Sequence, residues 1–159
     1  MEVKRTFDIL DRIAELFGDK EDMFAARVDG TWVKTTAKEY VDQAYRFANG
    51  LLSMGLKKGD RVISISNNRP EWNMADMGMS LAGVVNVPIY PTISEEEYTY
   101  ILEHAQPSLV ILSDSALYNR IKPLAGKVKS IRGVYTFNRV EGADHWEVIL
   151  KEGETYGEA

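Results

Sequence analysis

Residues 67–92, NNRPEWNMADMGMSLAGVVNVPIYPT, contain a segment with helical character followed by a short apolar run. The run before them, RVISIS (61–66), predicts a strand. Pro70 suits the first turn of a helix, and small or apolar side chains cover most of the circumference of that helix, which indicates a buried helix. Gly83 ends it, and residues 84–89 predict a second strand. The segment therefore predicts a strand–helix–strand unit.

The same alternation continues on both sides of this unit. Thr36 with Glu39, and Ser94 with Glu97, match the capping box that begins a helix. Continuous apolar strands separated by helices are typical of a parallel sheet covered on both faces. We therefore predict an α/β fold with a doubly wound, mostly parallel sheet and flanking helices. The expected helices begin at 36, 70, 94 and either 114 or 115, and the expected strands are 61–66, 84–89, 109–112 and 131–137.

Two further elements are expected before the sheet and one irregular segment after it. Apolar residues at helical spacing predict a short N-terminal helix over 7–17, and the Asp29-Gly30 pair between MFAARV and TWVKT predicts a tight β-hairpin. Residues 145–150 are expected to add a final helical turn or two. The polar segment KEGETYGEA (151–159) is expected to be a flexible tail. The whole of 1–159 is expected to form a single domain.

Composition limits the classes of function. The chain has 159 residues and a net charge of −5, which argues against nucleic-acid binding because such proteins usually present a basic patch. It has no cysteine, which fits the cytoplasm and excludes disulfides and cysteine-based zinc sites. No window approaches the length of apolar sequence that a membrane span requires.

A search for catalytic or ligand-binding patterns gives mostly negative results. There is no G-x-G motif, so a Rossmann or P-loop site is not expected. The histidines lack metal-ligand spacing, the serines follow no nucleophile-elbow pattern, and Asp76 is expected to face a polar seam more readily than to act as a functional carboxylate. Core packing is the favoured interpretation of the methionines, and Tyr90 is the best placed of four tyrosines for a ligand contact. The residues considered are Ser64, Ser66, His104, His145, Met74, Met77, Met79, Tyr90, Tyr98, Tyr100 and Tyr118.

Several segments together resemble one enzyme family. The chain contains, in order, DGTWVKTT (29–36), LLSMGLKKGDRV (51–62), the RPEW and VPIYPT elements of residues 67–92, SEEEYTYIL (94–102) and SLVILSD (108–114). This series resembles the N-terminal part of the long-chain fatty-acid–CoA ligases, which belong to the AMP-binding, adenylate-forming enzymes.

The resemblance implies ATP, Mg²⁺, CoA and a fatty acid for a complete ligase. Such an enzyme forms an acyl-adenylate and then transfers the acyl group to the thiol of CoA. Its Ser/Thr/Gly-rich phosphate loop has no counterpart in these residues, so no catalytic, cofactor-binding or metal-binding residue is assigned. We expect an inactive N-terminal scaffold of a larger AMP-binding domain. Its expected partners are the remainder of the enzyme and a second copy of the chain, and we expect peripheral contact of the ligase with membranes.

A second interpretation belongs to a different class of function. The same order of elements suits a free-standing flavodoxin-like binding or interaction module. Such a module would bind its ligand at a topological switch point of the sheet, at residues 67–69 or 90–94.

Overall fold

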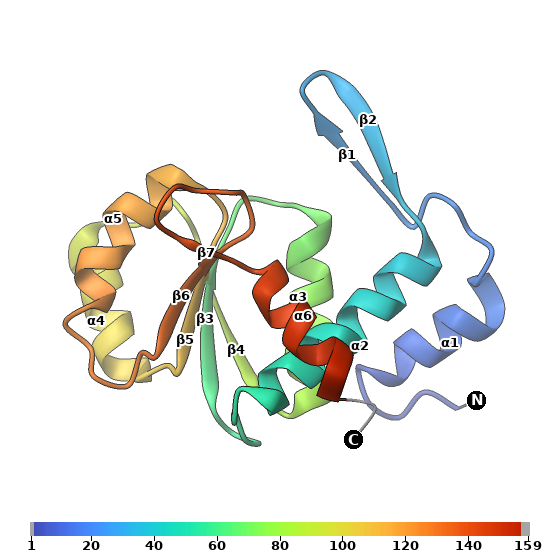
Figure 1. Ribbon diagram of the computed structural model, residues 1–159, viewed down its shortest axis with the longest axis horizontal. Coiled ribbons are helices and arrows are strands. Elements are labelled where there is room, and N and C mark those ends of the chain that lie inside the picture. The colour runs from blue at the N-terminus through green and yellow to red at the C-terminus, as the bar shows by residue number, and fades with distance from the viewer. Residues whose placement is uncertain (1, 157–159) are drawn as a thin grey trace.

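The computed structural model describes residues 2–156, which form a sheet with helices on both faces and an N-terminal unit at one side (Figure 1). The N-terminal unit contains helix α1 (Asp8–Phe17) and the antiparallel strands β1 (Phe24–Val28) and β2 (Thr31–Thr35). Both turn residues of the hairpin have positive φ, 48° for Asp29 and 82° for Gly30, as the predicted tight turn requires. The hairpin extends away from the body of the molecule (Figure 1). Its base is held by an edge-to-face contact between Phe24 and Tyr40.

Helix α2 (Ala37–Ser53) connects this unit to the sheet and has both predicted ends. The Thr36 and Glu39 side chains each bond the other residue's backbone, which completes the capping box. At the other end, Gly55 has φ of 80°, and the Leu56 amide donates to the Leu51 carbonyl over 3.0 Å. This 6→1 bond is the hallmark of the predicted Schellman ending.

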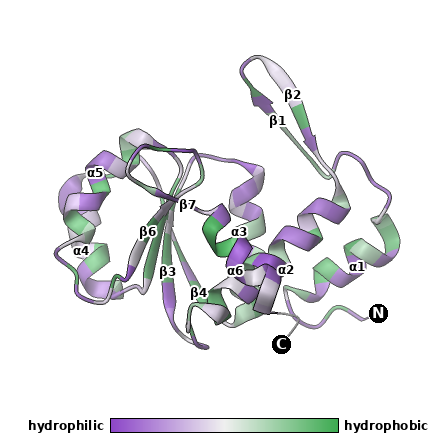
Figure 2. Cartoon of the chain, viewed as in Figure 1, coloured by the Kyte–Doolittle hydropathy of each residue, from purple (hydrophilic) through white to green (hydrophobic). Residues whose placement is uncertain are grey.

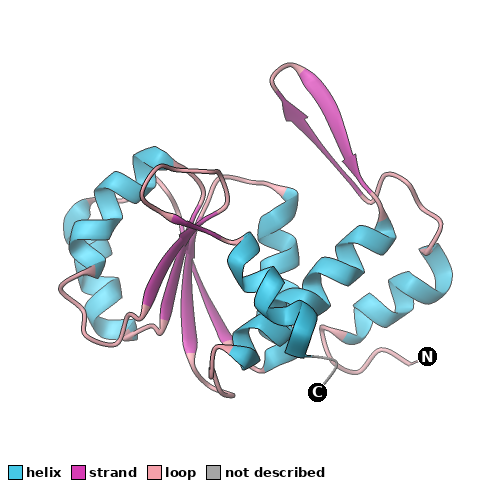
Figure 3. Cartoon of the chain, viewed as in Figure 1, coloured by secondary structure: helices cyan, strands magenta, loops and turns pink. Residues whose placement is uncertain are grey.

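The main sheet has five parallel strands in the order β4-β3-β5-β6-β7. Buried residues of α2, α3 and α6 form a core with one face of the sheet, and those of α4 and α5 form a core with the other face. Figure 3 shows these layers, and Figure 2 shows hydrophobic residues along the strands and hydrophilic ones on the visible side of α2. The predicted doubly wound α/β fold is confirmed. The elements are β3 (Arg61–Ile65), α3 (Pro70–Ala82), β4 (Val85–Ile89), α4 (Glu95–Ala105), β5 (Leu109–Leu112), α5 (Ser115–Ala125), β6 (Gly133–Thr136), β7 (Asp144–His145) and α6 (Glu147–Tyr156).

The C-terminal region differs most from the sequence-based expectation. Strand β7 was not predicted, because a two-residue strand has no periodicity to detect. The expectation of a flexible tail over 151–159 is wrong for residues 151–156, which continue helix α6, while residues 157–159 lie outside the described part. Helix α6 packs along α2, and Gly153 is buried at the crossing. A polar sequence with glycine is thus part of the helical layer, since its glycine allows close approach of two backbones.

Strand β4 also departs from the expected pattern. It lies at an edge of the sheet, and Val85 is about half exposed, so the strand is not covered as fully as β3 and β5. Pro88 lies within it. A proline has no backbone N–H, which makes an exposed edge less able to pair with another strand.

Candidate functional site

Polar residues follow the strands at the carboxyl edge of the sheet, where open α/β proteins usually bind ligands. The segment after β3 contains Asn67, Asn68 and Arg69, and the segment after β5 contains Ser113 and Asp114. Because all five strands are parallel, these segments meet at the same edge. The order β4-β3-β5 places a topological switch point between β3 and β5.

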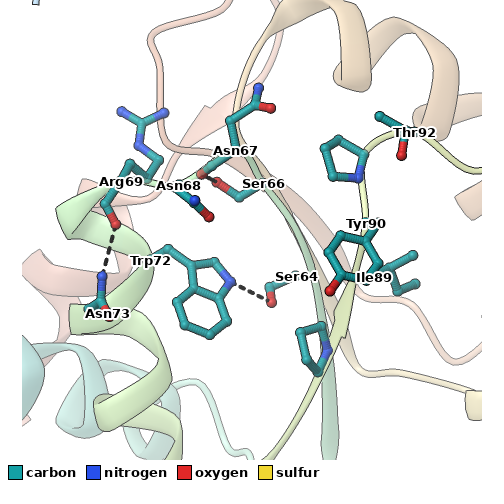
Figure 4. A pocket seen from close by; sticks show the side chains of 12 residues that line it. Ser64, Ser66, Asn67, Asn68, Arg69, Trp72, Asn73, Ile89, Tyr90 and Thr92 are labelled. Carbon is teal, nitrogen blue, oxygen red and sulfur yellow. Dashed lines mark hydrogen bonds between the residues drawn. The ribbon is translucent and has the colours of Figure 1, made fainter. Parts of the chain in front are cut away.

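The first cleft at this edge lies between α3 and the end of β4, and we call it the Trp72–Tyr90 cleft (Figure 4). Its volume is about 740 Å³. Trp72 forms one wall and Tyr90 the other, with Ser64 between them (Figure 4). The lining residues are Ser64, Ser66, Asn67, Asn68, Arg69, Trp72, Asn73, Pro88, Ile89, Tyr90, Pro91 and Thr92. Both segments that the module interpretation singled out, 67–69 and the start of 90–94, therefore reach one cleft.

A partly buried chain of hydrogen bonds supports the Trp72 wall. The indole Nε1 donates to Ser64 Oγ over 3.1 Å, and this hydroxyl donates to Asn86 Oδ1 over 2.8 Å. The Asn86 amide then donates to Asp76 Oδ1 over 2.8 Å. Asp76 thus lies in a polar seam, as favoured from the sequence, and links α3 to β4. The network was not predicted as such, although Ser64 and Asn86 are polar residues inside apolar runs and could have indicated it.

Arg69 connects the segments that follow β3, β5 and β6. Its guanidinium donates to both carboxylate oxygens of Glu71 over 2.9 and 3.0 Å, to the Ser113 carbonyl over 3.2 Å and to Asn138 Oδ1 over 3.0 Å. It also stacks 5.2 Å from the centre of the Phe137 ring. Burial works against ionisation of Glu71, but the hydrogen bonds and charge of Arg69 outweigh it and lower the pKa of Glu71. The Arg69 charge is therefore neutralised within the protein.

A second cleft of about 760 Å³ lies on the other side of Arg69, between the hairpin and the sheet edge. Ala26, Val28 and Val33 provide an apolar wall from the hairpin. Opposite them, His145 Nε2 lies 2.7 Å from the Phe137 carbonyl, and His145 Nδ1 lies 3.3 Å from the Glu147 carboxylate. Arg139 forms an ion pair with Glu147 in this cleft, and Arg27 donates to the Gly30 carbonyl.

The remaining residues considered from the sequence are distributed over the molecule. His104 stacks on Tyr100 along α4, whereas His145 lies on β7. Within residues 2–156 no group of three or more His, Asp or Glu side chains is placed to hold a metal. Tyr98 is buried and donates to the Tyr90 carbonyl over 3.1 Å, and Tyr118 donates to the Gly142 carbonyl over 2.7 Å. Met74 and Met79 are buried core residues and Met77 packs against the core, while Ser66 lines the Trp72–Tyr90 cleft.

Comparison with known proteins identifies the family. The model of the AMP-binding enzyme family matches residues 10–156. The chain belongs to the AMP-binding enzyme family. The resemblance expected from the sequence is thereby confirmed at the level of the family.

The similar proteins include acid–CoA ligases. Long-chain-fatty-acid–CoA ligase FadD15 of Mycobacterium bovis is 33% identical over 107 residues, which are 67% of this chain and 18% of that protein. Long-chain-fatty-acid–CoA ligase of Thermus thermophilus is 32% identical over 126 residues, 79% of this chain and 23% of that protein. A solved structure assigned as a long-chain-fatty-acid CoA ligase from Rhodopseudomonas palustris superimposes with a TM-score of 0.80 at 24% identity, over 92% of this chain and 36% of that one, which shows a shared fold. The chain thus spans about a fifth of the length of these curated relatives.

Proposed function

We propose that this AMP-binding family chain acts as the N-terminal scaffold of a long-chain fatty-acid–CoA ligase. The observation that supports it is the 32–33% identity to relatives named as long-chain-fatty-acid–CoA ligases. In the complete ligase, ATP and Mg²⁺ would support adenylation of a fatty acid, and CoA would accept the acyl group.

The described residues do not fit ATP and Mg²⁺ by themselves. Helix α3 begins at Pro70 after Arg69 with no glycine-rich turn, and Asp114 already caps the N-terminus of α5. A carboxylate at a helix N-terminus occupies the position that a phosphate would take. We therefore assign this chain a structural role and place no catalytic step on its residues.

A direct assay tests this assignment. Purified chain is incubated with ATP, Mg²⁺ and palmitate, and pyrophosphate release is measured, with the Thermus thermophilus ligase as positive control. We expect release equal to the protein-free background. Pyrophosphate formation that depends on palmitate and on this chain would overturn the scaffold assignment.

A chimera tests whether this chain belongs to a long-chain fatty-acid–CoA ligase. The corresponding N-terminal segment of the Thermus thermophilus ligase is replaced by this chain, and palmitoyl-CoA formation is measured. We expect measurable activity, because the replaced segment supplies sheet and helix packing with the same fold. A chimera that folds cooperatively yet forms no palmitoyl-CoA would contradict the proposal.

The N-terminal unit carries several exposed apolar side chains. These are Leu16 and Phe17 of α1 and Val28, Trp32 and Val33 of the hairpin, with Trp32 exposed by 66%. We propose that the remainder of the ligase covers these side chains and that the chain alone self-associates through the hairpin. Sedimentation velocity is expected to show concentration-dependent dimers that Trp32→Ser weakens. Identical monomer profiles for both forms at high concentration would contradict this.

The complete ligase is proposed to work in the cytoplasm and to touch membranes peripherally to collect fatty acids. No helix in residues 2–156 has the length and apolar character needed to cross a bilayer. Flotation of a complete relative with anionic and neutral vesicles tests the membrane contact, and absence from both vesicle fractions would count against it.

A further inference from the structure

The Trp72–Tyr90 cleft has an aromatic side chain on each of two opposing walls. Trp72 projects from α3, and Tyr90 projects from the segment after β4 (Figure 4). The cleft volume of about 740 Å³ lies within the range of small-molecule sites. Two aromatic side chains across such a space offer stacking surfaces to a flat ring.

The Trp72 wall is fixed before any ligand arrives. Its indole N–H is already bonded to the hydroxyl of Ser64, a residue that is 1% exposed, and this hydroxyl is itself bonded to Asn86. Turning the indole would leave a buried hydroxyl without its donor, which costs free energy. Because the N–H is occupied, Trp72 offers its ring, and not a hydrogen bond, to the cleft. A preorganised wall lowers the entropic cost of binding.

The Tyr90 wall is more open and its backbone is restrained. The Tyr90 residue is 80% exposed, between Pro88 and Pro91. Its carbonyl accepts a hydrogen bond from the buried Tyr98 hydroxyl. Pro91 directly follows Tyr90 and restricts its backbone conformation, so the exposed ring projects from a restrained segment. The Tyr90 ring therefore contributes little to packing within the described chain, and its free face is available to a ligand.

The polar groups around the two rings are uncharged. Asn68 and Thr92 present an amide and a hydroxyl to the cleft. The Ser66 hydroxyl donates to the Asn67 carbonyl, the Asn67 amide donates to Asp114 Oδ2 over 3.5 Å, and the Asn73 amide donates to the Arg69 carbonyl. Arg69 is the one charged residue among those that line the cleft, and its guanidinium is paired with Glu71 and points away from the two rings (Figure 4). A charged ligand would find no free counter-charge here, and a plain acyl chain would offer no hydrogen bond to the Asn68 amide.

We propose that the Trp72–Tyr90 cleft binds a planar, uncharged heteroaromatic ring of nucleobase size. The ring stacks against Trp72 and Tyr90, and its edge exchanges hydrogen bonds with the surrounding amides and hydroxyls. This inference stands independently of the ligase activity proposed above.

Calorimetry with adenosine as the probe tests the site directly. We expect saturable binding that hardly changes between low and high salt, because no charge pairing is involved. Tyr90→Ala is expected to weaken binding roughly 5- to 150-fold, the range found for removing one stacking partner. Tyr90→Phe keeps the ring and is expected to retain the affinity of the parent chain. Tyr90 is largely exposed, so neither change is expected to unfold the protein.

A matched control and two competing probes decide the outcome. Tyr100→Ala removes another exposed tyrosine that does not line this cleft and is expected to leave adenosine binding unchanged. Absence of saturable adenosine binding overturns the proposal, as does equal weakening by Tyr90→Ala and Tyr100→Ala. If dodecanoate binds, adenosine does not, and Tyr90→Ala abolishes the dodecanoate binding, the cleft is assigned to acyl chains. If phosphate binds and adenosine does not, the cleft is assigned to anions. Either result overturns the proposal.

Discussion

The crossing of α6 over α2 provides a sharp test of the fold. At Gly153 an added Cβ would overlap the Arg46 carbonyl oxygen and lie 2.8 Å from the Gly50 nitrogen. These are backbone atoms, so relief requires α6 to move away from α2. We predict that Gly153→Ala destabilises the protein, although alanine is the better helix former.

The magnitude follows from two opposing effects. Replacing glycine by alanine inside a helix favours folding by about 0.5–1 kcal/mol. Overpacking costs about 1–3 kcal/mol, and main-chain atoms place this site at the upper end of that range. The net loss in the free energy of unfolding is therefore about 2 kcal/mol, which corresponds to a fall in Tm of about 4–8 °C for a chain of this size.

Urea unfolding followed by circular dichroism measures this loss, and a second glycine supplies the control. Gly126 follows α5 with φ of −62°, and a Cβ there would meet no atom closer than 3.5 Å. Gly126→Ala is expected to be neutral or slightly stabilising. If Gly153→Ala were as stable as the parent chain, residues 151–156 would not be packed on α2, and the reasoning would fail.

Three other perturbations address electrostatics. Arg69→Met leaves the half-buried Glu71 without its partner and is expected to lower the free energy of unfolding by about 2–3 kcal/mol. Arg139→Met breaks an exposed ion pair and is expected to lower it far less. Equal losses for the two variants in urea unfolding would contradict this. The Arg5 side chain, with the Arg5 and Lys4 amides, lowers the pKa of Asp8 to about 2. The stabilisation contributed by the Asp8 carboxylate is therefore present above the ordinary pKa of 3.8 and is lost as pH falls toward 2. The difference in urea midpoint between the parent chain and Asp8→Asn should shrink over that pH window. The hydrogen bond from Tyr45 to Asp11 raises the pKa of Tyr45 to about 12, so this contact stabilises the fold below pH 10 and is lost as pH rises through 12. Burial raises the pKa of Tyr40 to about 12 as well, so the absorbance of tyrosinate should show more than one late-titrating group, and Tyr45→Phe should remove one of them.

The sequence by itself determined the elements whose causes are local. Thr36 with Glu39 and Asp29 with Gly30 act over at most three residues, so their capping box and turn could be predicted from spacing alone. The alternation of apolar strands with capped helices likewise determined the α/β class, because every strand of the main sheet needs a crossover to remain parallel.

The tertiary structure alone decided what depends on side chains distant in sequence. Ser64 meets Asn86 across 22 positions, and Gly153 meets the Arg46 backbone across more than a hundred. Neither contact leaves a periodic signal, since each depends on the order of strands and on how closely two helices approach. The strand order β4-β3-β5 also placed Trp72 and Tyr90 at one cleft. Local propensity selects the elements, and packing between them creates the site.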